Sequence, residues 1–338
     1  VSEAGRRAPP EHIAAIERIA PTLRALRHAD GGLARFHGGG RGLEGRLDQA
    51  LASSGVRAAN RPGLAMGFAR LSAARTTLIV DASPPPGGTA SRAAHASTLA
   101  FELTSGRRPL IVNCGSGRQF GPDWTRAGRA TASHSTLAIE GYSSSRVGTG
   151  TAAGQLTDRP RDVRMRVGSE TGGYGLVGSH DGYVATHGLT HVRNLEMSED
   201  GRGLVGEDML ATIDDADKPA FDKALDATRL QGIRFHVRFH LHPDVDAQLD
   251  MGGAAVSLAL KSGEIWIFRH DGVAKMALQP SVFLEKGRLK PRATKQIVLS
   301  AAALQYATRV RWTLAKAQHT PSHVRDLERD DSEMMAEQ

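Results

Sequence analysis

IRFHVRFHLH, at residues 233–242, alternates apolar and polar side chains along its whole length. One set of alternate positions is entirely apolar, and the other set is arginine or histidine. Successive side chains of a β-strand point to opposite faces of its sheet. Strict alternation of this length is therefore typical of a strand that buries one face. We expect His236, His240 and His242 to face solvent or a partner, between the arginines.

The same alternation recurs in VRMRV at 163–167 and in TRVRWTL at 308–314. Shorter apolar runs predict further strands at 76–81, 99–103, 109–113, 135–140, 189–198, 255–260, 264–269 and 294–299. Turn sequences separate them at 84–88, Asp181-Gly182, Asp200-Gly201 and Asp271-Gly272. Many strands joined by short turns, with no helices alternating between them, indicate antiparallel pairing. The sequence therefore predicts a mainly β protein, built as one large antiparallel β-sandwich.

The first part of the chain has a helical pattern instead. Apolar residues recur at helical spacing over 10–29, which predicts a helix that Pro21 breaks or kinks. A second short helix is expected at 43–53. The loop between them, at 28–42, contains HGGGRG, but it lacks the preceding strand and the Gly-Lys-Ser/Thr of a phosphate-binding loop. We therefore expect a flexible connector there and no nucleotide site.

These patterns divide the chain into three parts. A helical segment covers 1–58, the sandwich covers 59–315, and a charged tail at 316–338 is expected to be disordered. Within the sandwich, 213–230 is polar and irregular, which predicts a long loop with a helical turn.

Composition sets limits on compartment and partners. The 338 residues carry a net charge of +7, which favours a polyanion such as nucleic acid, anionic lipid or acidic polysaccharide. The charges are dispersed, however, so solvated strand faces explain them equally well, and no nucleic-acid-binding motif is present. No apolar run is long enough to span a membrane, and the opening VSEAGRRAPPEH lacks the apolar core of a secretion signal. The single cysteine, Cys114, excludes an intrachain disulfide and is expected to be a small buried residue at a strand end.

Three polar residues lie at the ends of neighbouring predicted strands. His95 comes just before the strand at 99–103, Asn113 ends the next strand, and His134 opens the strand at 135–140. The first two of these strands form a hairpin, so the three side chains could converge in space.

This region resembles the C-terminal β-sandwich of the heparinase II/III-type polysaccharide lyases. The matching stretches, in the family's order, are AAHASTLAFEL, VNCG, ATASHSTL, SHDGY, HVRNL and FHLHPDV. The resemblance runs over about residues 28–315. It implies that the helices at 10–53 are the last helices of an N-terminal α/α toroid. It also implies placement in the periplasm or cell envelope, while the lack of a secretion signal in this sequence leaves a cytoplasmic location open.

The resemblance implies cleavage of an acidic, uronate-containing polysaccharide by β-elimination, with that anionic glycan as the partner. It assigns His95 and His134 to catalysis, and His95, Asn113 and His134 to a zinc site. Two positions depart from the family's pattern: Ala93 replaces the first histidine of His-x-His, and Asn113 replaces an aspartate ligand. A neutral amide is a poor zinc ligand, so a hydrogen-bonded His–Asn cluster that orders the hairpin is the alternative.

Four further residues are candidates for substrate binding. Arg126 and Arg129 precede His134, and a guanidinium suits a carboxylate or sulfate; a solvated loop is the alternative. His180 and Tyr183 belong to SHDGY, where turn and strand packing is the alternative. Two functions therefore stay open. One is a polysaccharide lyase or its C-terminal half, and the other is a non-catalytic carbohydrate-binding or structural sandwich with a degenerate site.

Overall fold

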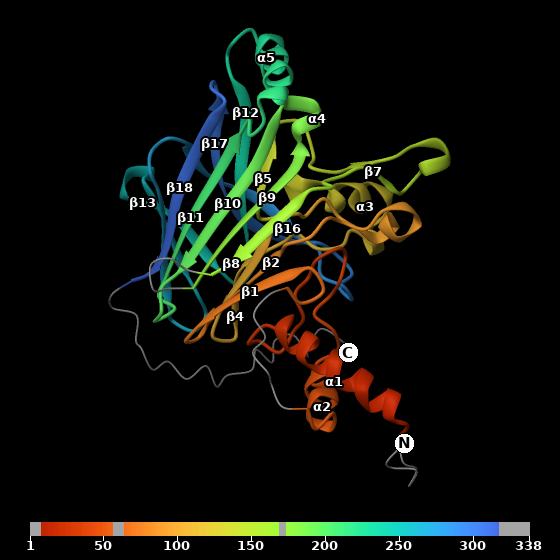
Figure 1. The fold of residues 1–338 in the computed structure, drawn as a ribbon. Helices are drawn as coiled ribbons and strands as arrows, with labels where there is room; N and C mark the ends of the chain where they lie inside the picture. The colour runs from red at the N-terminus through yellow and green to blue at the C-terminus, as the bar shows by residue number, and fades with distance from the viewer. Residues whose placement is uncertain (1–7, 57–63, 169–173, 318–338) are drawn as a thin grey trace.

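Two large antiparallel sheets share one apolar core in this protein (Figure 1). The structure is a computed structural model, and it describes residues 8–56, 64–168 and 174–317. The predicted mainly β sandwich, with a short helical part before it, is confirmed. The expected boundary at 58–59 and nearly all of the tail at 316–338 lie outside the described residues.

The first sheet has the strand order β1-β2-β3-β4-β12-β17-β16, and β5 also pairs with β12. Its strands are β1 (Phe68–Ala73), β2 (Thr76–Asp81), β3 (Phe101–Ser105), β4 (Arg108–Val112), β5 (Leu137–Ile139), β12 (Ile233–Leu241), β16 (Lys275–Phe283) and β17 (Arg292–Ala303). The alternating stretch quoted above thus forms β12, which lies inside the sheet with β17 on one side and β4 and β5 on the other.

The second sheet has the order β13-β14-β15-β18-β11-β10-β9-β8. Its strands are β8 (Val163–Val167), β9 (Tyr174–Tyr183), β10 (Leu189–Met197), β11 (Gly203–Ala211), β13 (Asp246–Asp250), β14 (Ala255–Ala259), β15 (Ile265–His270) and β18 (Ala307–Lys316). A small separate pair consists of β6 (Arg146–Val147) and β7 (Leu156–Asp158).

Aromatic rings from both sheets meet in the core. The Trp312 ring of β18 stacks on Phe101 of β3 with centroids 5.9 Å apart, and it meets Phe239 of β12 edge-on at 4.7 Å. Both contacts cross from one sheet to the other. Burial of such large rings supplies much of the hydrophobic stabilisation of a domain of this kind.

The outward face of β12 is not solvated as expected. Only 2% of His240 and 6% of His242 are exposed, so the expectation of solvent-facing histidines is wrong for these two. The His240 ring bonds to Ser281 of β16 through Nδ1 (2.8 Å) and to the Ala132 carbonyl through Nε2 (3.0 Å). The chain before β5 and the strand β16 therefore cover this end of β12, which a pattern local to β12 does not reveal.

The helices are α1 (Pro10–Ala25), α2 (Arg46–Ser53), α3 (Pro122–Arg129), α4 (Val184–His187) and α5 (Lys218–Ala227). The expected break at Pro21 does not occur, and α1 continues through it as a single helix. None of the described helices is both long and apolar enough to cross a membrane.

Two local predictions need correction. The segment expected to be a long loop contains α5, because Phe221 is buried and packs on the Tyr306 ring at 5.0 Å, which anchors a full helix. Asp181-Gly182 is not a turn, since β9 runs through it to Tyr183 and the chain reverses only at α4. The Gly182 N–H donates to His180 Nδ1 (3.1 Å), so a side chain of the same strand satisfies this backbone donor.

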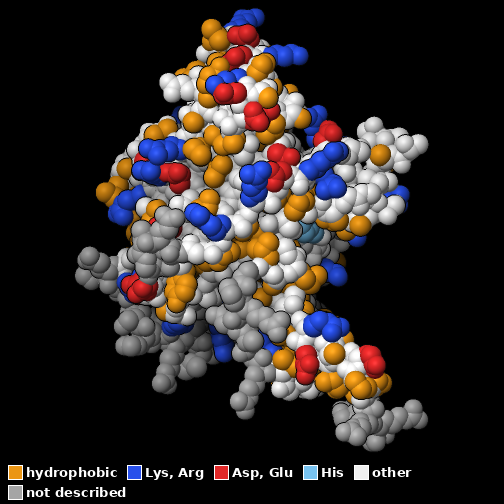
Figure 2. Space-filling view, viewed as in Figure 1, with side chains coloured by type: hydrophobic (Ala, Val, Ile, Leu, Met, Phe, Trp, Pro, Cys, Tyr) orange, Lys and Arg blue, Asp and Glu red, His pale blue; other side chains and the backbone are white. Residues whose placement is uncertain are grey.

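The surface charge is mixed on the face that Figure 2 draws. Basic and acidic side chains alternate there instead of forming one basic patch, and very little histidine reaches this surface (Figure 2). The dispersed charge of the sequence is therefore also dispersed on this face.

Candidate functional site

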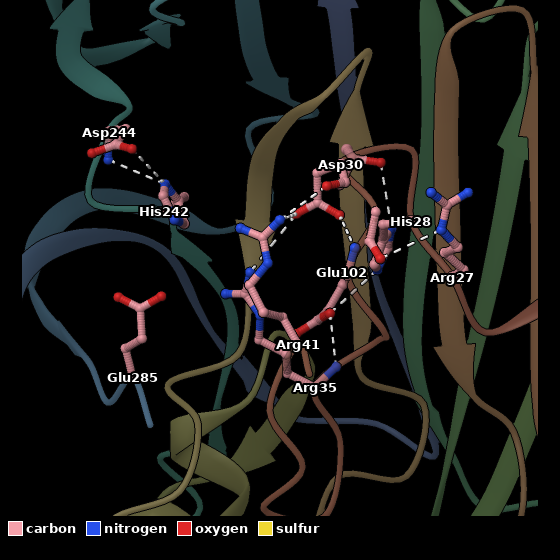
Figure 3. Close-up of polar contacts among 12 residues, drawn as sticks. Arg27, His28, Asp30, Arg35, Arg41, Glu102, His242, Asp244 and Glu285 are labelled. Carbon is pink, nitrogen blue, oxygen red and sulfur yellow. Dashed lines mark hydrogen bonds and ion pairs between the residues drawn. The ribbon is translucent and has the colours of Figure 1, made fainter. Parts of the chain in front are cut away.

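The glycine-rich loop at 28–42 is bound to the sandwich and is not a loose connector. His28 Nε2 lies 3.3 Å from Oε2 of Glu102, a buried carboxylate on β3. The backbone N–H of Arg35 donates to the same carboxylate oxygen (3.1 Å). Glu102 therefore holds two points of the loop against the first sheet (Figure 3).

A second acidic residue fixes the loop internally. The Asp30 carboxylate lies 4.0 Å from the guanidinium of Arg35 and 3.8 Å from that of Arg41, as Figure 3 shows. The Asp30 carbonyl also accepts a bond from Arg41 Nη2 (2.9 Å). The Arg35 guanidinium lies over the Phe283 ring at 5.1 Å, so the loop is tied to β16 as well as to β3.

This attachment places His37 beside the predicted site. The backbone N–H of His95 donates to His37 Nδ1 (3.1 Å), and His37 Nε2 lies 3.2 Å from Asp81 Oδ2. Asp81 is fully buried at the end of β2 and also accepts a bond from Ser97 Oγ (2.6 Å). No sequence pattern indicates a role for His37 or Asp81, because their contacts depend on how the loop lies on the sheet.

His95 and His134 meet as expected from the strand ends. His95 Nδ1 and His134 Nε2 are 3.1 Å apart, and His134 Nδ1 lies 2.8 Å from the Ala130 carbonyl. A carbonyl only accepts, so His134 donates from Nδ1 and offers a lone pair at Nε2. His95 then donates from Nδ1, which leaves its own lone pair on Nε2.

The His95 Nε2 atom faces the glycine-rich loop. A Cβ placed on Gly38 would lie 3.2 Å from Nε2, and Gly38 has a φ of +75°. Glycine is the residue that accepts both this close approach and this backbone conformation. The loop therefore closes tightly over the lone pair of His95.

Burial keeps both imidazoles neutral. Desolvation, with the charge of His134 and of neighbouring cations, lowers the pKa of His95 to about 2. Desolvation likewise lowers the pKa of His134 to about 4, against the bond to the Ala130 carbonyl that raises it. At neutral pH the pair is thus uncharged, and its one unused lone pair, on His95 Nε2, lies beneath the loop.

Asn113 lies near the pair but is committed elsewhere. Its Oδ1 accepts from the Ser135 N–H (2.9 Å), and its Nδ2 points to Glu102 Oε1 at 3.5 Å. Asn113 therefore offers no free oxygen to an ion beside the two imidazoles, and its neutral amide is a poor ligand for zinc. No cluster of three or more metal-ligating His, Cys, Asp or Glu side chains occurs among the described residues. The residues present do not fit a zinc site.

The two arginines of α3 differ sharply. Arg129 is 7% exposed and donates to three carbonyls, those of Ala94 (2.7 Å), Ser91 (2.9 Å) and Gly154 (2.9 Å). Its guanidinium is therefore bonded to the backbone and is not available to a substrate. Arg126 is exposed beside Asp123, with which it forms an ion pair one helical turn apart.

His180 and Tyr183 are buried away from the surface. The Tyr183 hydroxyl donates to the Leu137 carbonyl (3.1 Å), and burial raises its pKa well above the usual range. His180 Nε2 lies 3.2 Å from His191 Nδ1, in a fully buried polar network. Both side chains bond within the sandwich, as the packing alternative for SHDGY predicts.

That network crosses between the sheets. His191 Nε2 lies 2.8 Å from Asp208 Oδ1, and Arg193 binds both oxygens of Asp208, at 2.8 and 3.1 Å. Arg193 Nη1 also donates to the carbonyls of Leu99 (2.7 Å) and Ser135 (2.9 Å), which flank the histidine site. A buried ion pair on the second sheet thus positions the backbone next to His95 and His134.

Cys114 is a small buried residue just after β4, as expected. Its Sγ lies 3.4 Å from His240 Nδ1, and burial raises the pKa of its thiol to about 11. The thiol therefore stays protonated at neutral pH and is a poor nucleophile.

Comparison with known proteins identifies the family of this chain. The sequence profile described as "Heparinase II/III-like, C-terminal" matches residues 56–313. The chain belongs to the heparinase II/III-like family. The resemblance inferred from the sequence motifs is thereby confirmed.

Individual relatives of this heparinase II/III-like chain are of two kinds. It is 31% identical over 330 residues to FtsZ-localized protein C of Caulobacter vibrioides (strain NA1000 / CB15N), over 94% of this chain and 54% of the relative. The heparan sulfate lyase HepC mutant from Pedobacter heparinus shares the fold with a TM-score of 0.68 and 13% identity, over 93% of this chain and 48% of that one. A crystal structure of heparinase III gives a TM-score of 0.67 and 12% identity, over 91% and 49%. The chain spans about half the length of these proteins.

Proposed function

We propose that this chain is the sandwich half of a polysaccharide lyase-like protein, that it binds an acidic glycan of the periplasm or cell envelope, and that it does not cleave this glycan by itself. The observation that carries the proposal is the neutral His95–His134 pair beneath the glycine-rich loop. The glycan would lie along the surface above His95 and His134, which we call the histidine edge. The exposed cation of Arg118, whose charge acts on His95, lies beside it.

Cleavage by β-elimination needs a base and an acid. The base takes the proton from C5 of the uronate, the electron pair forms the C4–C5 double bond, and the C4 oxygen leaves with a proton from the acid. A useful base has a pKa near the working pH. The pKa of His95 is about 2, and each unit below neutrality costs about 1.4 kcal/mol of driving force.

The histidine pair also offers no proton to the leaving oxygen. Both histidines are neutral, and Tyr183 is buried in the core with its hydroxyl bonded to Leu137. Tyr142 contacts His187, the Tyr306 hydroxyl bonds to Asp222, and Tyr174 begins β9 in the second sheet. Binding without cleavage is therefore the activity that these residues support best.

We expect Arg118→Glu to weaken the binding of heparin, heparan sulfate or alginate oligosaccharides by at least about tenfold, because a charge-assisted contact becomes a repulsion. Isothermal titration calorimetry measures the affinity. The ultraviolet absorbance of unsaturated uronate, followed in the same samples, should not rise. Arg309→Glu is the control, because it makes the same charge change at an exposed position of β18.

Two outcomes would contradict this proposal. A steady rise in absorbance would make the chain a lyase in its own right. The proposal would also be wrong if no acidic glycan bound, or if Arg309→Glu weakened glycan binding as much as Arg118→Glu does. Arg126, exposed on α3, stays a proposed contact at the same edge and should behave like Arg118.

We infer a second role, association with the cell-division site, from the likeness to FtsZ-localized protein C. The identity of 31% extends over 94% of this chain, so it includes both the helical segment and the sandwich. A fluorescent fusion of the native protein should therefore concentrate at the division plane. A uniform signal along the cell, from a fusion shown to be intact, would argue against this role and would leave the glycan proposal untouched.

A further inference from the structure

A groove lies where α4 and α5 meet β5 and the start of β12. Figure 1 shows these elements at the end of the sandwich that is remote from α1 and α2. Its volume is about 630 Å³, within the size of ordinary small-ligand sites. It shares no lining residue with the histidine edge, since neither the loop at 28–42 nor His95 or His134 borders it.

Small residues keep this groove open. Ala220, Ala224 and Ala227 face it from α5, at positions that fall on one side of a helix. Gly232 borders the groove from the chain before β12, with a φ of +91° that favours glycine. The wall formed by α5 is thus lined by small side chains, which leave room for a ligand.

An aromatic ring is fixed at one wall. Tyr142 is 44% exposed, yet its ring meets the His187 ring edge-on at 4.5 Å, and the Arg146 guanidinium lies over it at 5.7 Å. The Thr186 hydroxyl donates to the Tyr183 carbonyl, so His187 donates from Nδ1 to Thr186 Oγ1 (2.7 Å) and is itself held. The ring therefore offers a positioned apolar surface to a ligand.

The rim carries more positive than negative charge. Lys223, Arg234 and Glu140 border the groove. The Glu140 carboxylate lies 3.8 Å from Arg234 and 3.7 Å from His236, both longer than a direct hydrogen bond. Lys223 forms no ion pair with any residue in the described ranges. One ammonium and a loosely held guanidinium thus remain available to an anion.

We propose that this groove binds one acidic sugar residue of a glycan chain. Lys223 and Arg234 would take its carboxylate or sulfate, and the apolar face of the sugar ring would lie on Tyr142. Glu140 and Gln231 supply the acceptor and amide that sugar hydroxyls require. The inference shares the glycan class of the proposed function but uses a different site, so each can fail without the other.

Calorimetric titration of the whole chain with a heparin tetrasaccharide and with an oligogalacturonate tetrasaccharide tests it. We expect two binding events per chain. Lys223→Glu and Tyr142→Ala should each weaken one event by at least about tenfold, and Arg118→Glu should weaken only the other. Lys218→Glu is the matched control, because Lys218 lies on the same helix but pairs with Asp215 (2.6 Å) outside the groove.

The outcomes separate the two sites. A single event that Arg118→Glu abolishes and Lys223→Glu leaves intact would overturn the groove and keep the histidine edge. A single event with the reverse behaviour would support the groove and overturn the edge. The groove would not be an acidic-sugar site if Lys218→Glu lost as much affinity as Lys223→Glu, or if a neutral maltotetraose bound equally tightly. Circular dichroism on each variant confirms that the exposed substitutions leave the fold intact.

Discussion

Asp208→Asn should lower the free energy of unfolding by about 3–5 kcal/mol, the usual consequence of breaking a buried ion pair on one side. Asp208 is fully buried, and the cation of Arg193 beside it holds its pKa well below the usual range, against the desolvation that would raise it. Its two oxygens receive bonds from Arg193, His191 and the Trp312 indole (3.0 Å). Asparagine keeps one acceptor oxygen, so the guanidinium of Arg193 would stay buried without a counter-charge.

The neighbouring residue supplies the control for this measurement. Glu207 also pairs with an arginine, Arg311, but both side chains are partly exposed. Glu207→Gln should therefore cost no more than about 1 kcal/mol. Urea unfolding of both variants gives the comparison, and equal losses would show that Arg193 and Asp208 do not organise the interior as we describe.

The pH dependence of this effect has a definite sign. Because the folded pKa of Asp208 is depressed, its contribution is present above the pKa of about 4 that an unfolded aspartate has. The contribution is lost as the pH falls through that range toward the folded value. Asp208→Asn should therefore differ most from the native protein at neutral pH and converge with it in acid.

The sequence predicted the fold where a strand carries its own signal. VRMRV at 163–167 forms β8 within the predicted bounds, and the alternation of 233–242 forms β12. The sequence did not predict β1, β6, β7, β9, β11, β13 or β16. For two of these the reason is visible: β11 begins at a glycine and has no strict alternation, and β16 contains Pro280. Proline is tolerated on an edge strand such as β16, but it weakens a strand prediction.

The site residues also divide into those that the sequence could place and those that it could not. The sequence could place His95 and His134 together, because His95 precedes the first strand of the predicted hairpin and His134 opens the next predicted strand. In the structure, His95 Nδ1 and His134 Nε2 are 3.1 Å apart. His37 could not be placed, because a glycine-rich loop has no periodicity that tells where it will lie. Asp208 could not either, since a lone acid on a strand reads as solvent-facing until its Arg193 partner is located one strand away.

Acid should begin to destabilise this protein well above the pH at which its carboxylates titrate. His95, His134 and His240 are buried and neutral, with pKa values of about 2, about 4 and about 3, each lowered mainly by desolvation. In the unfolded chain each would have a pKa of about 6.5. Between pH 6.5 and about 4 these three histidines alone allow the unfolded state to bind up to three more protons, so stability falls as the pH falls.

The size of this effect follows from the number of protons. Each additional proton that the unfolded state binds lowers the free energy of unfolding by about 1.4 kcal/mol per pH unit. Three protons therefore lower it by about 4 kcal/mol per unit. A stability of about 10 kcal/mol at neutral pH would then be exhausted two to three units lower. We expect His134→Gln to reduce the slope of unfolding free energy against pH by about 1.4 kcal/mol per unit, whatever it does to stability at pH 7.

His12→Gln separates this cause from a general effect of removing a histidine. His12 is exposed on α1, where water surrounds it in the folded and the unfolded chain alike, so its replacement should leave the slope unchanged. Urea unfolding at a series of pH values from 7.5 to 4.5 gives the slope for each protein. If His134→Gln and His12→Gln lie on parallel curves, the folded protein protonates His134 near neutrality. The neutral His95–His134 pair, on which binding without cleavage rests, would then be wrong.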